Sequence, residues 1–375
     1  MLPINMELKR EEKAIFYLRS LFEQHGYSQF KMNKFEEYDL YVRNKDFLIS
    51  DGIITFTDTN GKLLALKPDV TLSIIKNFRH TPGVCSKLYY NENVYRVSSG
   101  THSFKELMQV GVECMGEVDE YALYEMLSLA AKSLLVLSQD AVLDISDFST
   151  VSLLLDEFGL DADIKKQVLA AIGEKNAHEL LALCKKIGLS ADKISVLTEL
   201  VALYGEPHEV FSRAVTLLSP YVKTGNLSRL ERICSRLAEN GLGNMIRIDF
   251  SVVNGADYYN GIVFRGYIKG VPTWILSGGQ YDRLMQKMNH QAGAVGFAVY
   301  LDLLEELEDC GKPYDVDAVL IYNDNDSISD VDKALQSLIS EGKTAVAQKN
   351  IPEEVRYREL WNLTEQGGKQ IERNA

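Results

Sequence analysis

Two strand-like segments follow one another without a helix between them, and this order restricts the fold. Residues 107–116 (LMQVGVECMG) alternate in polarity, as a half-buried β-strand does. The apolar positions on one side are Met108, Val110, Val112 and Cys114. The segment before it, 86–97 (SKLYYNENVYRV), is rich in tyrosine and valine, which favour strands. Because helical patterns gather elsewhere in the chain, we predict an α+β fold on an antiparallel sheet rather than a doubly wound one.

Other segments extend this pattern along the chain. Residues 52–69 predict a β-hairpin, because the Asn60–Gly61 pair favours a tight turn between two alternating segments. A run of short helices separated by glycines, from about 153 to 238, predicts a helical insertion. Further helices are predicted at 7–25, 71–78, 120–137 and 294–307, and further strands at 142–145, 245–253, 261–268 and 273–279.

The predicted elements divide the chain into two domains. Residues 1–312 form the larger domain, which includes the helical insertion. Residues 313–375 form a small α/β domain, in which we expect the polar tail after Glu365 to be frayed. The elements predicted in the small domain are strands at 317–323 and 344–348 and a helix at 330–340.

Composition and the spacing of residues argue against several classes of function. The chain has a net charge of −13, from 40 basic and 53 acidic side chains, which argues against a tRNA-binding protein. The five cysteines form no CxxC pair and none lies near a histidine at zinc-ligand spacing, so we predict reduced thiols and no metal site. No glycine-rich phosphate loop follows a strand, and no cofactor is predicted.

The predicted cellular location is the cytoplasm. The first residues (MLPINMELKREEKAIF) lack the apolar core of a signal peptide. No apolar run is long enough to cross a bilayer, so we expect no association with a membrane.

The polar side of the strand at 107–116 is the first candidate for a site. It carries Gln109, Gly111 and Glu113. A polar face on an antiparallel strand is often only solvated. A glycine on the same face also leaves room for a ligand to approach the backbone, so both interpretations stay open at this point.

Five short motifs occur in a fixed order between residues 7 and 307. They are LKPDVT (66–71), VYR (94–96), QVGVE (109–113), GADYYNGIVF (255–264) and SGGQYDRL (277–284), the last followed by AGAVGFAV. Together they resemble the catalytic domain of the class II histidyl-tRNA synthetases. The resemblance implies an antiparallel sheet with the active site on one face, and a dimer formed through an early helix and strand.

The resemblance also implies a pocket for free histidine. A zwitterion with an imidazole ring needs anionic acceptors for its ammonium, a cation for its carboxylate and flat aromatic walls. By resemblance, an acidic and a hydroxyl residue lie near the α-amino group, a Gln–Glu pair holds the ammonium, two tyrosines close on the imidazole, and an arginine contacts the carboxylate. In that order, these residues are Asp69, Thr71, Gln109, Glu113, Tyr258, Tyr259 and Arg96.

Two departures from the synthetase pattern predict binding without catalysis. Asn254 and Leu303 stand where the synthetases carry arginines that act on ATP phosphates or on charge developing during adenylate formation. Losing one such preorganised donor costs roughly 10²–10³ in rate. The groups that bind ground-state histidine remain, so we predict a receptor with no catalytic residues.

A synthetase-like chain with these departures resembles the regulatory subunits of ATP phosphoribosyltransferase. That resemblance implies a short-form catalytic subunit as partner, commonly in a hetero-octamer with four copies of each chain, and histidine as feedback inhibitor, with no tRNA. The main alternative is a synthetase paralogue that activates an amino acid and transfers it to another acceptor. A second alternative is an RNA-binding relic, which predicts strongly salt-dependent tRNA binding.

Overall fold

The computed structural model describes residues 9–44, 52–97, 103–253, 258–306, 314–351, 354–364 and 367–373. The chain forms two compact units. One is Lys9–Glu306, and the other contains Leu307–Ala375. Each unit has its own sheet and its own buried apolar cluster.

The larger unit contains a nine-stranded sheet with the order β1-β5-β6-β12-β11-β10-β7-β9-β8. Only the pairs β1–β5 and β7–β9 are parallel, so the predicted α+β class and antiparallel sheet are confirmed. The strands are β1 (Ser28–Gln29), β5 (Ser86–Val97), β6 (Phe104–Gly116), β7 (Ala141–Asp147), β8 (Tyr204–Gly205), β9 (Ile246–Asp249), β10 (Ile262–Ile268), β11 (Leu276–Gln280) and β12 (Gly293–Tyr300).

Helices α1 (Arg10–Gln24) and α4 (Glu120–Leu137) cover one face of this sheet. Helix α4 contacts β7, β10 and β12, and α1 contacts α4, β5 and β6. Phe22 of α1 is fully buried, with its ring centroid 6.2 Å from Tyr89 and 6.1 Å from Phe297. This packing uses the apolar side of β6, which leaves its polar side to face away from the two helices.

We expect Phe22→Ala to lower the free energy of unfolding by about 3–5 kcal/mol, because it removes a large ring from a closed core. Phe16→Ala is the matched control, since Phe16 lies on the same helix and is 59% exposed. Its effect should stay within about 0.5 kcal/mol. Urea denaturation of both variants measures the difference, and equal losses would contradict the packing described here.

On the polar side of β6, a short helix and a small sheet pack against the central strands. The helix is α3 (Thr71–Asn77), and the three-stranded sheet has the order β2-β4-β3. The predicted hairpin is confirmed, with Gly61 at φ 79° and with the Asp58 carboxylate accepting the N–H groups of Asn60 and Lys62 at 2.8 Å. The other elements here are α2 (Tyr38–Arg43), β2 (Phe35–Glu37), β3 (Thr55–Thr57), β4 (Leu63–Leu66) and α11 (Asp282–Lys287).

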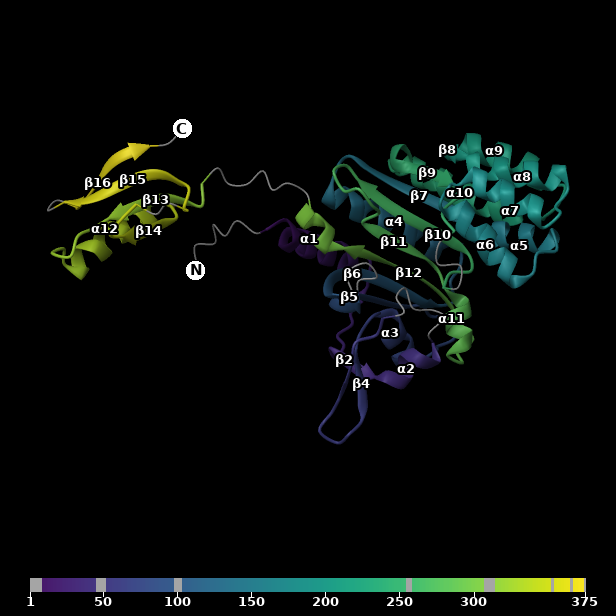
Figure 1. Cartoon of the computed structure of the whole chain (residues 1–375), viewed down its shortest axis with the longest axis horizontal. Coiled ribbons are helices and arrows are strands. Elements are labelled where there is room, and N and C mark those ends of the chain that lie inside the picture. Colours follow the sequence, from purple (N-terminus) through teal and green to yellow (C-terminus); the bar gives the residue numbers. More distant parts are fainter. Residues whose placement is uncertain are drawn as a thin grey trace. The chain divides into compact units, whose positions relative to one another are not determined.

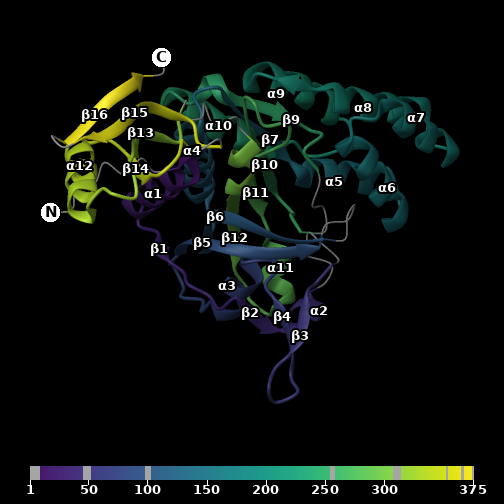
Figure 2. The same cartoon turned by 60° about the vertical axis from the view of Figure 1, so that its left-hand side comes forward.

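A run of helices follows β7 and lies together beside β7 and β9 (Figure 1 and Figure 2). It extends from Phe148 to Glu239, with the two-residue strand β8 between α8 and α9. Its helices are α5 (Phe148–Glu157), α6 (Ala162–Gly173), α7 (Ala177–Lys186), α8 (Ala191–Ala202), α9 (Pro207–Leu218) and α10 (Gly225–Glu239).

In the described residues of the smaller unit, a four-stranded sheet with the order β14-β13-β15-β16 is accompanied by one helix. Leu338 of the helix packs in one cluster with Leu320 of the sheet. The predicted strands at 317–323 and 344–348 and the predicted helix at 330–340 are confirmed. The elements are β13 (Val316–Ile321), α12 (Ile328–Ser340), β14 (Ala345–Gln348), β15 (Tyr357–Thr364) and β16 (Gly367–Arg373).

Three sequence predictions are wrong. Residues 294–307 were expected to be helical, but the described part, up to Glu306, forms β12 and a 3₁₀-helix, Leu301–Glu306. A short apolar run does not distinguish a helix from a buried strand, and pairing with β6 and β11 decides the matter. In the polar tail after Glu365, which was expected to be frayed, Gly367–Arg373 form strand β16 and pair with β15.

The third error concerns the strand predicted at 245–253, which ends at Asp249. The Asp249 carboxylate accepts the Ser251 N–H at 2.9 Å and the Ser251 hydroxyl at 2.6 Å. This local turn satisfies the backbone without a partner strand and ends β9 early.

Candidate functional site

All seven residues predicted from the sequence lie around one cavity. They reach it from different elements. Thr71 begins α3, and Asp69 stands just before that helix. Arg96 is on β5, Gln109 and Glu113 are on β6, and the tyrosine pair precedes β10. The structure therefore brings together side chains that are up to 190 positions apart in the sequence, from Asp69 to Tyr259.

Glu113 lies deep in this cavity and is 2% exposed. The Thr71 hydroxyl donates to Glu113 Oε1 at 2.7 Å, and the Tyr281 hydroxyl donates to Oε2 at 2.5 Å. Burial raises the pKa of the Glu113 carboxyl to about 8, although these two hydrogen bonds oppose the shift. The carboxyl is thus held in place and is mostly protonated at neutral pH.

Gly296 of β12 provides the space that the Glu113 carboxylate occupies. The two residues are opposite each other in the β6–β12 ladder. A Cβ atom built on Gly296 would fall 1.7 Å from Glu113 Oε2 and 2.6 Å from the Val112 carbonyl oxygen. Any side chain at position 296 would therefore displace the carboxylate or the strand.

Asp69 supplies a second buried carboxylate. Its Oδ1 accepts the Leu72 N–H at 2.9 Å, as an acid near a helix N-terminus does. Burial raises the pKa of the Asp69 carboxyl, while the Leu72 N–H and the nearby Arg96 guanidinium lower it. Arg96 is anchored by its Nε, which donates to the Pro68 carbonyl at 3.1 Å.

Gln109 presents a buried amide to the cavity. The side chain is 3% exposed, and its Nε2 has no hydrogen-bond partner among the described residues. An unsatisfied buried donor costs about 1–3 kcal/mol, so such a group points to a ligand acceptor. With Arg96 it forms a donor-rich part of a cavity that otherwise offers carboxylates.

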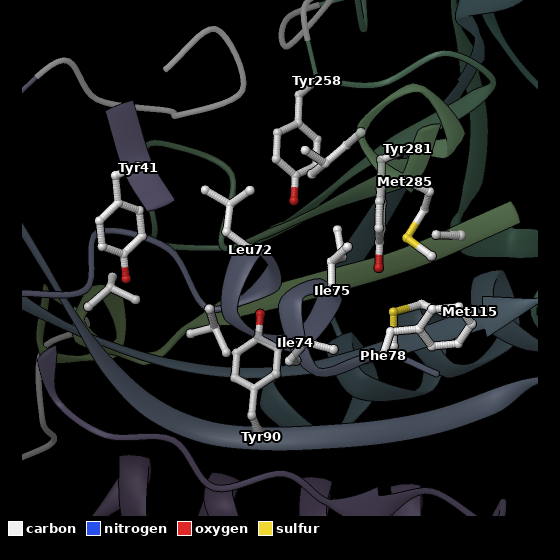
Figure 3. Close-up of a cluster of buried hydrophobic side chains, with 14 of the residues drawn as sticks. Tyr41, Leu72, Ile74, Ile75, Phe78, Tyr90, Met115, Tyr258, Tyr281 and Met285 are labelled. Carbon is white, nitrogen blue, oxygen red and sulfur yellow. The ribbon is translucent and has the colours of Figure 1, made fainter. Parts of the chain in front are cut away.

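Aromatic side chains enclose the rest of the cavity. The rings of Tyr258 and Tyr259 lie 4.7 Å apart in an edge-to-face arrangement, and Tyr281 is 5.7 Å from Tyr258. Figure 3 shows the hydroxyl groups of Tyr90 and Tyr258 pointing toward each other. Burial raises the pKa of the hydroxyls of four tyrosines, so they stay neutral and can donate or accept hydrogen bonds. These are Tyr90, Tyr258, Tyr259 and Tyr281.

Sequence reasoning missed half of the lining. The side chains or backbone of Tyr90, Ser277, Tyr281, Gly296, Phe297, Ala298 and Tyr300 also border the cavity. Part of this set was missed because residues 294–307 were predicted to be a helix. In strand β12, Gly296, Ala298 and Tyr300 lie on one side, opposite Glu113, Gly111 and Gln109 of β6.

The two positions at which the sequence predicts a departure from the synthetase pattern are placed differently. Asn254 lies outside the described residues. Leu303 lies in the 3₁₀-helix Leu301–Glu306, directly after β12, and is partly buried. Among the described residues, no group of three or more His, Cys, Asp or Glu side chains is arranged to hold a metal ion. No helix in the described part of the chain is both long and apolar enough to cross a membrane.

The part of the chain that forms this cavity is similar to a known protein family. A family model described as Histidyl-tRNA synthetase matches residues 3–304. The chain belongs to the histidyl-tRNA synthetase family. That match covers the whole sheet of the larger unit and every residue that lines the cavity, so the resemblance predicted from the five motifs is confirmed.

Within the histidyl-tRNA synthetase family, curated relatives carry a different name from the synthetases. The chain is 29% identical over 349 residues to the ATP phosphoribosyltransferase regulatory subunit of Clostridium kluyveri, covering 90% of this chain and 89% of the relative. The similar protein of Alkaliphilus metalliredigens has the same name and is 27% identical over 307 residues, 77% of this chain and 76% of its own. The predicted resemblance to these regulatory subunits is thereby confirmed.

A solved structure shows the same fold. The ATP phosphoribosyltransferase regulatory subunit/histidyl-tRNA synthetase of Bacillus halodurans matches with a TM-score of 0.71 at 24% identity, covering 90% of this chain and 88% of that one. The predicted class II synthetase-like architecture is confirmed by this likeness.

Proposed function

We propose that this chain is a regulatory subunit of ATP phosphoribosyltransferase that binds free histidine and performs no chemistry of its own. The names of its relatives support the regulatory role. The observation that carries the histidine site is the convergence of Asp69, Glu113, Arg96 and Gln109 on one tyrosine-lined cavity. We further propose that the protein works in the cytoplasm.

The cavity matches the charge pattern of an amino acid. The two buried carboxylates, Asp69 and Glu113, can accept hydrogen bonds from an ammonium group, and Arg96 can pair with a carboxylate. The tyrosines offer flat walls and hydroxyl groups to an imidazole ring. Charge-assisted hydrogen bonds contribute about 1.5–3 kcal/mol each, so three or four of them suffice for a dissociation constant of roughly 1 μM.

The absence of catalysis rests on positions 254 and 303. Asparagine and leucine stand there instead of the two arginines that the synthetase pattern has. If the two losses are independent, they reduce the rate of adenylate formation by roughly 10⁴–10⁶. Groups that hold the amino acid in its ground state remain in the cavity, and this is the arrangement that a sensor needs.

The proposed partner is a short-form catalytic subunit. A chain in the ATP phosphoribosyl transferase (HisG:HisZ) complex of Thermotoga maritima has this fold, with a TM-score of 0.62 at 19% identity, covering 79% of this chain and 98% of that one. We propose a self-dimer that assembles with the catalytic chain into a hetero-octamer, with no role for tRNA. Histidine then inhibits by binding better to the inactive arrangement, and a coupling of roughly 1–3 kcal/mol gives 5–150-fold control.

Two measurements on the purified chain test this proposal. Isothermal titration should show saturable histidine binding, and a pyrophosphate-exchange assay with histidine and ATP should show no exchange above background. Robust exchange would identify an amino-acid-activating enzyme instead. Mixing the chain with a short-form phosphoribosyltransferase should raise the activity of the catalytic subunit, and histidine should reverse the gain. If both proteins remain folded in the mixture but the activity of the catalytic subunit neither rises nor responds to histidine, the regulatory role is rejected.

A further inference from the structure

A buried lysine stands beside the cavity without lining it. Lys67 is 1% exposed, and its ammonium forms an ion pair with Glu92 of β5, whose side chain is 18% exposed. Lysines are almost never fully buried unless they are paired. Neither side chain is among the described residues that line the cavity. The pair therefore needs an explanation other than contact with the ligand.

The pair ties the segment that carries Asp69 to β5. The Lys67 carbonyl accepts the Tyr95 N–H at 2.8 Å, and the Pro68 carbonyl accepts Arg96 Nε at 3.1 Å. The Lys67 ammonium adds a third attachment through Glu92. Asp69 lies two residues after Lys67 in the sequence. The segment that positions its carboxylate is therefore fixed to β5 by two hydrogen bonds and one ion pair.

Glu92 also stands next to the residue with the unsatisfied amide. In the β5–β6 ladder, Glu92 is directly opposite Gln109, and opposite residues in an antiparallel pair have side chains on the same face. The remaining Glu92 oxygen accepts the Met32 N–H at 3.4 Å. The ion pair thus has Lys67 close to Asp69 in the sequence and Glu92 opposite Gln109 in the sheet.

We propose that the Lys67–Glu92 pair is a positioning device for the amino-acid end of the ligand. It holds the Asp69 carboxylate where it meets the ammonium group, while the tyrosine walls around the ring do not depend on it. This inference rests on the proposed histidine site. A purely structural ion pair would affect folding and would reduce the binding of every ligand alike.

The test compares two ligands on one set of variants. Histidine has the ammonium group, and 3-(imidazol-4-yl)propanoate lacks it but keeps the ring and the carboxylate. Lys67→Met should weaken histidine binding by about tenfold or more, the loss of one charge-assisted contact, and should change the binding of the analogue by less than about threefold. Lys67→Arg, which keeps a cation for Glu92, should restore most of the histidine affinity.

Two further variants keep the result interpretable. If Lys67→Met does not fold because Glu92 is left unpaired, the double variant Lys67→Met, Glu92→Met replaces the pair by apolar groups, which proteins often tolerate. It should show the same selective loss. Lys62→Met is the matched control, because Lys62 forms an exposed pair with Glu37 at 2.6 Å and should leave the binding of both ligands unchanged.

Three outcomes would overturn the inference. A folded Lys67→Met or double variant that binds histidine as the parent does shows that the pair positions nothing. An equal loss for both ligands shows a general structural role. If the parent itself binds no histidine, the proposed function fails, and the inference fails with it.

Discussion

Replacing Gly296 with alanine should abolish histidine binding. The added methyl group would fall 1.7 Å from Glu113 Oε2 and 2.6 Å from the Val112 carbonyl oxygen. Strand β12 cannot move away easily, because it is hydrogen-bonded to β6 on one side and β11 on the other. The carboxylate must leave its place between Thr71 and Tyr281, and we expect a loss of about 1–3 kcal/mol in the free energy of unfolding.

Isothermal titration and urea denaturation measure the two effects of Gly296→Ala. Gly225→Ala, at the start of α10, is the control, because no atom lies within 4 Å of a Cβ built there. This control should bind histidine with parental affinity. If Gly296→Ala also binds histidine normally while remaining folded, histidine does not occupy this cavity.

Replacing Glu113 with glutamine should change how stability depends on pH. The Glu113 pKa is about 8 in the folded protein, against an ordinary value of 4.5. Between these values the folded carboxyl keeps a proton that the unfolded one has lost, so the free energy of unfolding falls as pH rises. The total change attributable to this group is at most roughly 5 kcal/mol. Glutamine does not titrate, so the free energy of unfolding of the variant should rise relative to that of the parent from pH 5 to pH 8.

Histidine binding should respond to the same substitution. An ammonium group needs the ionised carboxylate, so Glu113→Gln should weaken binding by about 10–150-fold at pH 8. The affinity of the parent should rise between pH 6 and pH 8, by up to about tenfold per unit, as Glu113 loses its proton. The glutamine variant lacks this contribution, and titration of the ligand itself is common to both proteins.

Glu106→Gln is the control for removing a negative charge, since Glu106 lies at the exposed start of the same strand. It should leave both pH profiles as they are in the parent. Urea denaturation and titration calorimetry at several pH values provide the data. Parallel profiles for Glu113→Gln and the parent would mean that Glu113 does not control the site.

Long regular patterns made much of the fold predictable. The predicted helix at 120–137 coincides with α4, and the predicted strand at 86–97 coincides with β5. Both segments carry their signal over many residues. Strand β12 was missed because its eight residues are apolar on both sides, and only the neighbouring strands determine their conformation. Strand β16 was missed for the opposite reason, because nearly all of it is exposed and polar.

Some residues of the candidate site could likewise be predicted from a local pattern, and others could not. Gln109 and Glu113 could be predicted because alternation along one strand places them on one face. The effect of Gly296 on Glu113, and the position of Glu92 beside Gln109, depend on the register between strands. Register is set by pairing over a whole sheet, and a local pattern in a single sequence does not contain it.

Gly296 lines the cavity, and Gly111 and Gly279 lie on the two strands that pair with β12; at each of the three a Cβ atom would collide with a main-chain oxygen. The cavity is therefore a hollow left by missing side chains, and part of its wall is main chain in the middle of a sheet. Such a wall cannot retreat by a change of rotamer, as a wall of leucines or methionines could. A bulkier amino acid with the same charges would be refused by size alone, and the chain could recognise its ligand without any moving lid.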